Sequence, residues 1–267
     1  MTSAHAGMPG HALTIQIRVI GALMMRELHT KFGRNNIGYL WAVLEPMLLS
    51  IGVTAIHLST SMSHRLPFAM ESAPFWITGY TSFILFRSII LNAMGAIQGN
   101  RGLLYHRVVT LQDLMVARAL LDGAMTAFAL CLLLGAAAVL GMGHMPERPL
   151  LMLTGLLLLL WLSLGLSMLI AALSEWSHTF ERLVHPVIYL IMPASGAFFL
   201  LEWLPTRFAD VLSWVPMVQI MQMIREGEWE NFDSIYIRPL YIVAWCMVTT
   251  FLGLFSLRLL RRHLEIE

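Results

Sequence analysis

The stretch LLMLTGLLLLLWLSLGLSMLIAAL, residues 150–173, decides the fold class of this chain. It contains no charged residue, and it is long enough to cross the hydrocarbon core of a bilayer, which takes roughly 20 apolar residues in an α-helix. A helix satisfies its backbone hydrogen bonds internally, as any segment surrounded by lipid must do. The stretch therefore predicts a transmembrane helix.

Apolar stretches of similar length occur throughout the chain. Of its 267 residues, 58% are hydrophobic and only 12% are charged, whereas about a quarter of the residues in soluble domains are charged. The five further stretches are residues 37–58, 75–97, 117–140, 183–201 and 239–260. We therefore expect an all-α membrane protein with six transmembrane helices.

Basic residues are unevenly distributed between the two sides that these spans define. Eleven fall on the side of both termini, namely Arg18, Arg26, Lys31, Arg34, Arg101, Arg107, Arg118, Arg182, Arg258, Arg261 and Arg262. Five fall on the opposite side, namely Arg65, Arg148, Arg207, Arg225 and Arg238. Cytoplasmic segments of membrane proteins carry an excess of Lys and Arg, so we expect both termini in the cytoplasm.

Shorter segments flank the predicted spans. Residues 13–31 carry apolar side chains at helical spacing, which predicts a helix in the membrane interface or one packed on cytoplasmic protein. Residues 206–215 and 217–226 are too short to cross, and they predict re-entrant or surface helices before the last span. We accordingly divide the chain into a cytoplasmic N-terminus with the interface helix, residues 1–36, and a transmembrane domain, residues 37–267.

The sequence lacks the motifs of several functional classes. Its single lysine, Lys31, follows Thr30 and precedes Phe32, whereas a Walker loop needs a lysine between Gly and Ser or Thr. We therefore expect no cofactor in this chain, with ATP bound by a separate subunit, and no enzymatic activity. The histidines have no metal-ligand spacing, no Gly-x-Ser-x-Gly element occurs, and a net charge of +1 gives no reason to expect nucleic acid. A membrane-embedded enzyme stays open only through residues that no motif identifies. Residues 1–13 have no apolar core, so we expect no cleavable signal peptide.

Two ionisable residues, Glu45 and Arg87, fall well inside predicted spans. A charge at the centre of a membrane helix costs roughly 2.5–3.5 kcal/mol on insertion scales, so we expect neither side chain to face lipid. At about 1.5 Å per residue, both come out at a similar depth, roughly 12 Å from the cytoplasmic edge. They either form an ion pair between the first two spans or line a hydrophilic conduit. Arg118 and Asp122, one helical turn apart, are expected to pair with each other.

Aromatic residues form a stripe on the second predicted span. Trp76, Tyr80 and Phe83 recur at helical spacing and lead to Arg87. Aromatic rings stack on the apolar faces of sugar rings while their polar rims form hydrogen bonds, so the stripe is a candidate glycan contact. The alternative is a membrane-interface belt combined with helix packing.

Four longer segments carry a resemblance to a known family. They are RELHTKFGRNNIGYLWAVLEPML (26–48), NRGLLYHRVVTLQDLMVARALLD (100–122), PASGAFFLLEWLP (193–205) and WVPMVQIMQMIREGEW (214–229). The first contains a Gly-x-Leu-Trp element that ends at Trp41. Together the four segments resemble the permeases of the ABC-2 group, most closely those that export capsular polysaccharide in Gram-negative bacteria.

The resemblance implies a half-transporter of the bacterial inner membrane, whose two copies form a channel and recruit two separate ATP-binding cassette subunits. It also implies a lipid-linked capsular polysaccharide as substrate, with a periplasmic polysaccharide co-polymerase and an outer-membrane export protein as further partners. The alternative is an ABC-2 permease for another polysaccharide, such as O-antigen or teichoic acid, or for an amphipathic lipid or drug.

Two groups of site residues follow from the residue patterns and the resemblance together. The substrate pathway is expected to include Trp41, Glu45, Trp76, Tyr80, Phe83 and Arg87. Coupling to the ATPase is expected to use Arg101, His106, Arg107 and Asp113. The latter lie in the basic segment 99–116, for which a solvated loop is the alternative.

Overall fold

The structure, a computed structural model, describes residues 9–32, 36–59, 70–97, 99 and 110–264. These residues are mostly helical, and they include no strand. The helices are α1 (Pro9–Phe32), α2 (Asn36–Ser59), α3 (Ser72–Ala93), α5 (Leu111–Val139), α6 (Pro149–Trp176), α7 (His178–Ile191), α8 (Thr206–Ser213), α9 (Pro216–Glu228) and α10 (Pro239–Leu264). Short 3-10 helices cover Met192–Ala194 and Leu201–Trp203. The prediction of an all-α fold is confirmed.

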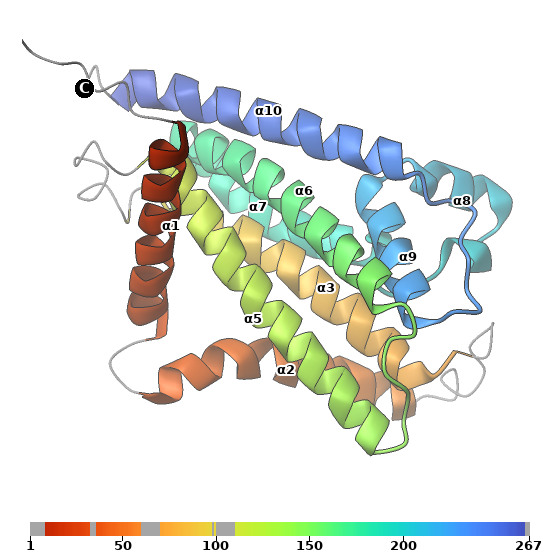
Figure 1. Cartoon of the computed structure of the whole chain (residues 1–267). Coiled ribbons are helices and arrows are strands. Elements are labelled where there is room, and N and C mark those ends of the chain that lie inside the picture. The colour runs from red at the N-terminus through yellow and green to blue at the C-terminus, as the bar shows by residue number, and fades with distance from the viewer. Residues whose placement is uncertain (1–8, 33–35, 60–69, 98, 100–109, 265–267) are drawn as a thin grey trace, which may run out of the picture.

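Helices α3, α5, α6 and α10 form a bundle in which α10 runs along α6 (Figure 1). Each of the four is long and apolar enough to cross a membrane, and α3 is the most buried of them. The backbones of α6 and α10 approach closely at two glycines, because a Cβ atom on Gly253 would lie 2.7 Å from the carbonyl oxygen of Gly165. Small residues allow such close packing between membrane helices.

Four of the six predicted spans correspond to these long helices. The stretches 75–97, 117–140, 150–173 and 239–260 fall largely in α3, α5, α6 and α10. The first predicted span, residues 37–58, lies in α2, which continues through Pro46, and the segment Val43–Ser59 of this helix is apolar but shorter than the four long helices. The structure thus supports four spans, and the count of six stays a prediction.

The fifth predicted span, residues 183–201, is wrong as a continuous helix. Helix α7 ends at Ile191, a 3-10 turn follows, and the chain is non-helical from Ser195 to Leu200. Pro193 lacks the backbone N–H that another helical turn would need. Gly196 then takes a φ of 82°, a left-handed conformation that favours glycine. Hydropathy alone did not reveal this break.

A buried arginine satisfies the carbonyl groups that the break leaves open. Arg225 of α9 is 1% exposed, and its guanidinium donates to the carbonyl oxygens of Gly196 at 2.8 Å, Ala197 at 2.6 Å and Phe199. The same group lies 4.0 Å from the centre of the Phe75 ring on α3. Unsatisfied backbone groups cost several kcal/mol in a bilayer interior, so this arginine makes the non-helical turn tolerable.

Helix α9 packs closely on α6. A Cβ atom on Gly227 would lie 2.4 Å from the backbone nitrogen of Met152, and one on Gly155 would lie 2.7 Å from the Ile224 side chain. The two short helices expected before the last span are confirmed as α8 and α9, while their depth in a membrane stays a prediction. The packing of α9 against the bundle agrees with the rule that irregular backbone at membrane depth must contact protein or water.

Helix α1 crosses the bundle near the beginning of α5 and the end of α10 (Figure 1). The predicted helix at residues 13–31 lies within it. Glu27 of α1 forms an ion pair with Arg118 of α5 at 2.7 Å, and the Gln16 amide donates to Asp113 at 3.1 Å. Two polar contacts therefore fasten α1 to α5. Its location in the membrane interface stays a prediction.

The substitution Gly79→Ala is expected to destabilise the protein by about 1–3 kcal/mol. A Cβ atom at this position of α3 would lie 2.1 Å from the Ala197 carbonyl oxygen and 2.8 Å from Arg225 Nη2. The matched control is Gly135→Ala in α5, where a Cβ atom meets no atom within 4 Å. Unfolding temperatures in detergent, followed by tryptophan fluorescence, should fall for Gly79→Ala alone. Equal values for both variants would show that the turn does not need a glycine beside it.

Candidate functional site

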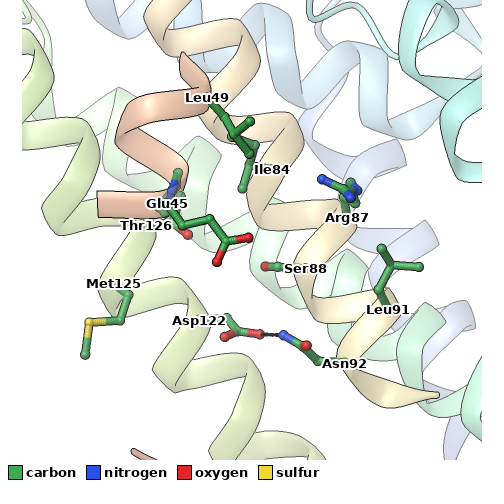
Figure 2. A pocket seen from close by; sticks show the side chains of 11 residues that line it. Glu45, Leu49, Ile84, Arg87, Ser88, Leu91, Asn92, Asp122, Met125 and Thr126 are labelled. Atoms are coloured by element: carbon green, nitrogen blue, oxygen red, sulfur yellow. Dashed lines mark hydrogen bonds between the residues drawn. The ribbon is translucent and has the colours of Figure 1, made fainter. Parts of the chain in front are cut away.

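A polar cavity of about 190 Å³ lies between α2, α3 and α5. Its polar lining consists of Glu45, Arg87, Ser88, Asn92, Asp122 and Thr126, and its apolar lining of Pro46, Leu49, Ile84, Leu91 and Met125. Figure 2 shows Glu45, Ser88, Asn92 and Asp122 around the space between the three helices. Ionisable groups within membrane segments are functional candidates by default. This cavity is therefore the candidate functional site.

The cavity brings Glu45 and Arg87 together, as their similar depth predicted, but the structure does not pair them. No ion pair joins these two described residues. Arg87 instead donates from Nη2 to the Tyr189 hydroxyl of α7 at 2.7 Å, and its guanidinium carbon lies 5.0 Å from the centre of that ring. The Glu45 carboxylate extends between α3 and α5 (Figure 2). Of the two alternatives left open by the sequence, the geometry favours lining of a polar space.

The side chains of Asn92 and Asp122 form one wall of the cavity. Asn92 Nδ2 donates to Asp122 Oδ2 at 2.7 Å, the contact dashed in Figure 2. The sequence predicted that Asp122 pairs with Arg118, whereas the structure shows Arg118 paired with Glu27 of α1 and donating to the backbone carbonyl of Asn92 at 2.9 Å. At the cavity, the Asp122 carboxylate accepts a hydrogen bond from the neutral Asn92 amide.

The cavity is equipped to hydrogen-bond a hydroxylated ligand. Glu45 and Asp122 supply carboxylate acceptors, and Ser88 and Thr126 supply hydroxyl groups. No group of His, Cys, Asp and Glu residues with the arrangement of a metal site occurs within the part of the chain that the structure describes.

The aromatic stripe of α3 packs inside the chain. Trp76 is 9% exposed and stacks on His57 of α2 with ring centres 3.7 Å apart, while Phe83 is 1% exposed. The Tyr80 ring lies 6.3 Å from that of Phe198. These contacts are those of helix packing, and glycan contact by the stripe stays a prediction. Trp41, by contrast, is 54% exposed on α2.

Most of the residues predicted to couple to an ATPase lie outside the described residues, namely Arg101, His106 and Arg107. Asp113 is described, and it is 4% exposed. Its carboxylate accepts hydrogen bonds from the Thr110 backbone N–H and hydroxyl in a capping box at the start of α5, and from Gln16 of α1. Asp113 thus has a clear role inside the chain, and its coupling role stays a prediction.

Sequence reasoning missed several cavity residues that it had the means to find. Ser88 and Asn92 lie one turn apart on α3, which places these two polar side chains on one face of the helix. Asp122 and Thr126 show the same four-residue spacing on α5. Tyr189 gave no such signal, because its contact with Arg87 depends on how α7 packs on α3.

The end of the bundle away from α1 carries a cluster of acidic residues. The loop between α5 and α6 places His144 Nε2 3.2 Å from Glu71 Oε2, and the Trp229 indole N–H donates to the same oxygen at 2.9 Å. Glu228, the last residue of α9, is fully buried, and neither carboxylate oxygen has a hydrogen-bond partner. The cluster fastens this loop, the segment before α3 and the end of α9 together.

The charge of this cluster depends on pH. Burial raises the pKa of Glu228 from 4.5 to about 7, and nearby His144 partly opposes the rise. Partial burial alone would lower the pKa of His144, but its hydrogen bond to Met145 and the Glu71, Glu228 and Glu147 carboxylates outweigh that effect and raise this pKa. The pKa values of both groups are therefore raised, that of Glu228 to about 7.

The comparison with known proteins gives a consistent result. A family model described as ABC-2 type transporter matches residues 18–229. The chain is 34% identical over 243 residues to the capsule polysaccharide export inner-membrane protein CtrC of Neisseria meningitidis serogroup A, covering 91% of each chain. It is 29% identical over 254 residues to the capsule polysaccharide export inner-membrane protein BexB of Haemophilus influenzae, covering 95% of each. It is 27% identical over 243 residues to the polysialic acid transport protein KpsM of Escherichia coli, covering 90% of this chain and 92% of the relative.

The acidic cluster gives a pH-dependent prediction. Because the folded state holds the Glu228 proton more tightly than the unfolded chain, its contribution to stability is complete below about pH 4.5 and is lost as the pH rises to about 7. The unfolding temperature of the wild type should therefore fall between about pH 5 and about pH 8, and Glu228→Gln should reduce that fall. Glu230→Gln, at an exposed residue nearby, is the matched control. Identical pH profiles for Glu228→Gln and the wild type would contradict the assignment.

Proposed function

The chain belongs to the ABC-2 type transporter family, and from this premise we propose that it is the channel-forming permease subunit of an ATP-driven exporter of lipid-linked capsular polysaccharide. The single observation that carries the proposal beyond the family is the polar cavity lined by three helices of a predominantly apolar chain. Relatives named as capsule polysaccharide export proteins, aligned over nine-tenths of the chain, support the choice of substrate.

The assembly that we propose follows from what the sequence lacks. With its only lysine in a context that cannot form a Walker loop, the chain needs a separate source of ATP hydrolysis. We propose a homodimer in the bacterial inner membrane with both termini cytoplasmic and two ATP-binding cassette subunits docked on the cytoplasmic side. Arg101, His106 and Arg107 are proposed to contact those subunits. A periplasmic co-polymerase and an outer-membrane export protein would receive the polymer.

The cavity suits a polymer that must keep moving. Asp122, Glu45 and Ser88 offer hydrogen bonds to sugar hydroxyl groups, and the same groups exchange partners as one sugar unit replaces the next. Conduction requires binding that is favourable enough to admit the substrate and weak enough to release it. A wall of mixed polar and apolar side chains meets both requirements better than a site of high affinity.

A second candidate, an ABC-2 permease for an amphipathic lipid or drug, is favoured by the apolar half of the same lining. Pro46, Leu49, Ile84, Leu91 and Met125 would contact an acyl chain or a ring system. Another polysaccharide, such as O-antigen or teichoic acid, would use the polar half as a capsular polymer does. When the gene is removed, a polysaccharide exporter leaves polysaccharide inside the cell, whereas a lipid or drug exporter leaves the lipid or drug there.

Deletion of this chain from its native bacterium should abolish surface polysaccharide and cause it to accumulate inside the cell. Complementation with the wild type should restore export, and complementation with Ser88→Leu should restore about a tenth or less, a loss of ~1.4 kcal/mol or more, because leucine removes a hydroxyl group and fills the cavity. Surface polysaccharide is measured by immunoassay, with protein levels from an immunoblot.

Thr154→Leu is the matched control for this experiment. The Thr154 hydroxyl donates to the carbonyl three residues earlier on α6, as Ser88 does on α3, but Thr154 is exposed and lies outside the cavity. It should export at the wild-type rate. Normal surface polysaccharide in the deletion strain would reject the polysaccharide function, whereas normal export by Ser88→Leu would reject only the pathway through this cavity.

A further inference from the structure

A continuous series of polar contacts joins α1 to the cavity. It begins at Glu27, which is 7% exposed although it is charged. Its carboxylate lies 2.7 Å from Arg118 Nη2 of α5, and the two side chains are only 10% and 18% exposed. Glu27 also lies 3.7 Å from its neighbour Arg26. Loss of one partner from an ion pair so little exposed to water leaves an unpaired charge, which strongly destabilises the folded protein. Glu27 and Arg118 therefore constrain each other.

The second contact fixes the end of α3. Arg118 Nη1 donates to the backbone carbonyl of Asn92 at 2.9 Å, and α3 ends one residue later at Ala93. The last carbonyl groups of a helix have no partner within the helix, and a cation is the favoured donor there. The guanidinium of Arg118 therefore joins the carboxylate of α1 to the C-terminus of α3.

The third contact reaches the cavity itself. Arg118 binds the backbone carbonyl of Asn92, and the Asn92 side chain donates to Asp122 at 2.7 Å in the wall of the cavity (Figure 2). Asp122 lies one turn after Arg118 on α5. The series thus runs Glu27, Arg118, Asn92, Asp122, and it crosses from α1 to α5, to α3 and back to α5.

We propose that Glu27 and Arg118 are positioning residues that couple the placement of α1 to the geometry of the Asn92–Asp122 pair in the cavity. When α1 moves relative to α5, the Arg118 side chain either breaks its ion pair with Glu27 or moves with Glu27. Either response changes the hydrogen bond from Arg118 to the Asn92 carbonyl. The role of this link in export rests on the proposed function, whereas the structural link between α1 and the cavity is independent of that function.

The test uses a cysteine reporter in the cavity of the full-length chain in native membranes. The two natural cysteines are replaced, Cys131→Ser and Cys246→Ala, and Met125→Cys is introduced into the cavity lining. The rate of modification by a small methanethiosulfonate reagent then reports on access to the cavity. Glu27→Gln keeps the shape of the side chain and removes its charge, and we expect it to change the rate at position 125 by about threefold or more.

Gln16→Ala is the matched control, since it removes the other polar contact between α1 and α5. Gln16 donates to Asp113, which caps α5 and does not line the cavity. This variant should leave the rate at position 125 unchanged. Equal effects of the two variants, or no effect of Glu27→Gln, would overturn the proposal. Should Glu27→Gln fail to accumulate, Glu27→Asp replaces it, and its shorter side chain should shift the rate in the same direction.

A double-mutant cycle on export separates positioning from general stability. Glu27 and Asp122 belong to different helices and are joined through Arg118 and Asn92, so structural losses from Glu27→Gln and Asp122→Ala that do not pass through these contacts would multiply independently. The proposal predicts that the double variant exports about as well as Asp122→Ala alone. Independent losses in export would overturn it. If Glu27→Gln changes the labelling rate but no polysaccharide is exported by the wild type or by any variant, the link between α1 and the cavity is upheld and the proposed function is rejected.

Discussion

The structure depends on the hydrogen bonds that Arg225 donates to a break in the chain. The carbonyl groups of Gly196, Ala197 and Phe199 follow the end of α7, where no helical N–H is available to them. One fully buried guanidinium serves all three, which ties α9 to the turn after α7 and places both against α3 beside Gly79. In lipid such a requirement is absolute, because water cannot replace a missing donor.

The same constraint shapes the cavity. Arg87 Nη2 donates to Tyr189 and Asp122 accepts from Asn92, while Arg87 Nε is buried without a hydrogen-bond partner, so the polar groups around the cavity are partly paired and the space between them stays polar. Glu45 and Arg87 line one cavity, while their depth in the membrane stays a prediction. The hydrogen-bond partners of Arg87 and Asp122 were not predictable, because each partner lies on another helix and the sequence alone does not show how the helices pack.

Hydropathy is read from consecutive residues, so it predicts spans that are apolar along their length but not breaks that depend on distant contacts. The four long apolar helices match stretches of high hydropathy, and the family resemblance is confirmed. The stretch 183–201 failed because its apolar composition conceals the effects of Pro193 and Gly196, and because the compensating arginine follows some 30 residues later. Likewise, Arg118 could not be assigned to Glu27, since a carboxylate one turn away was the nearer candidate in sequence.

We propose that this chain is the membrane part of a transporter whose ATPase lies on another subunit. The most direct test is to purify the chain from its native membrane in mild detergent and to determine the mass of the intact particle. The account predicts two copies of the chain with two copies of an ATP-binding subunit. A stable, transport-competent particle without an ATPase would contradict it.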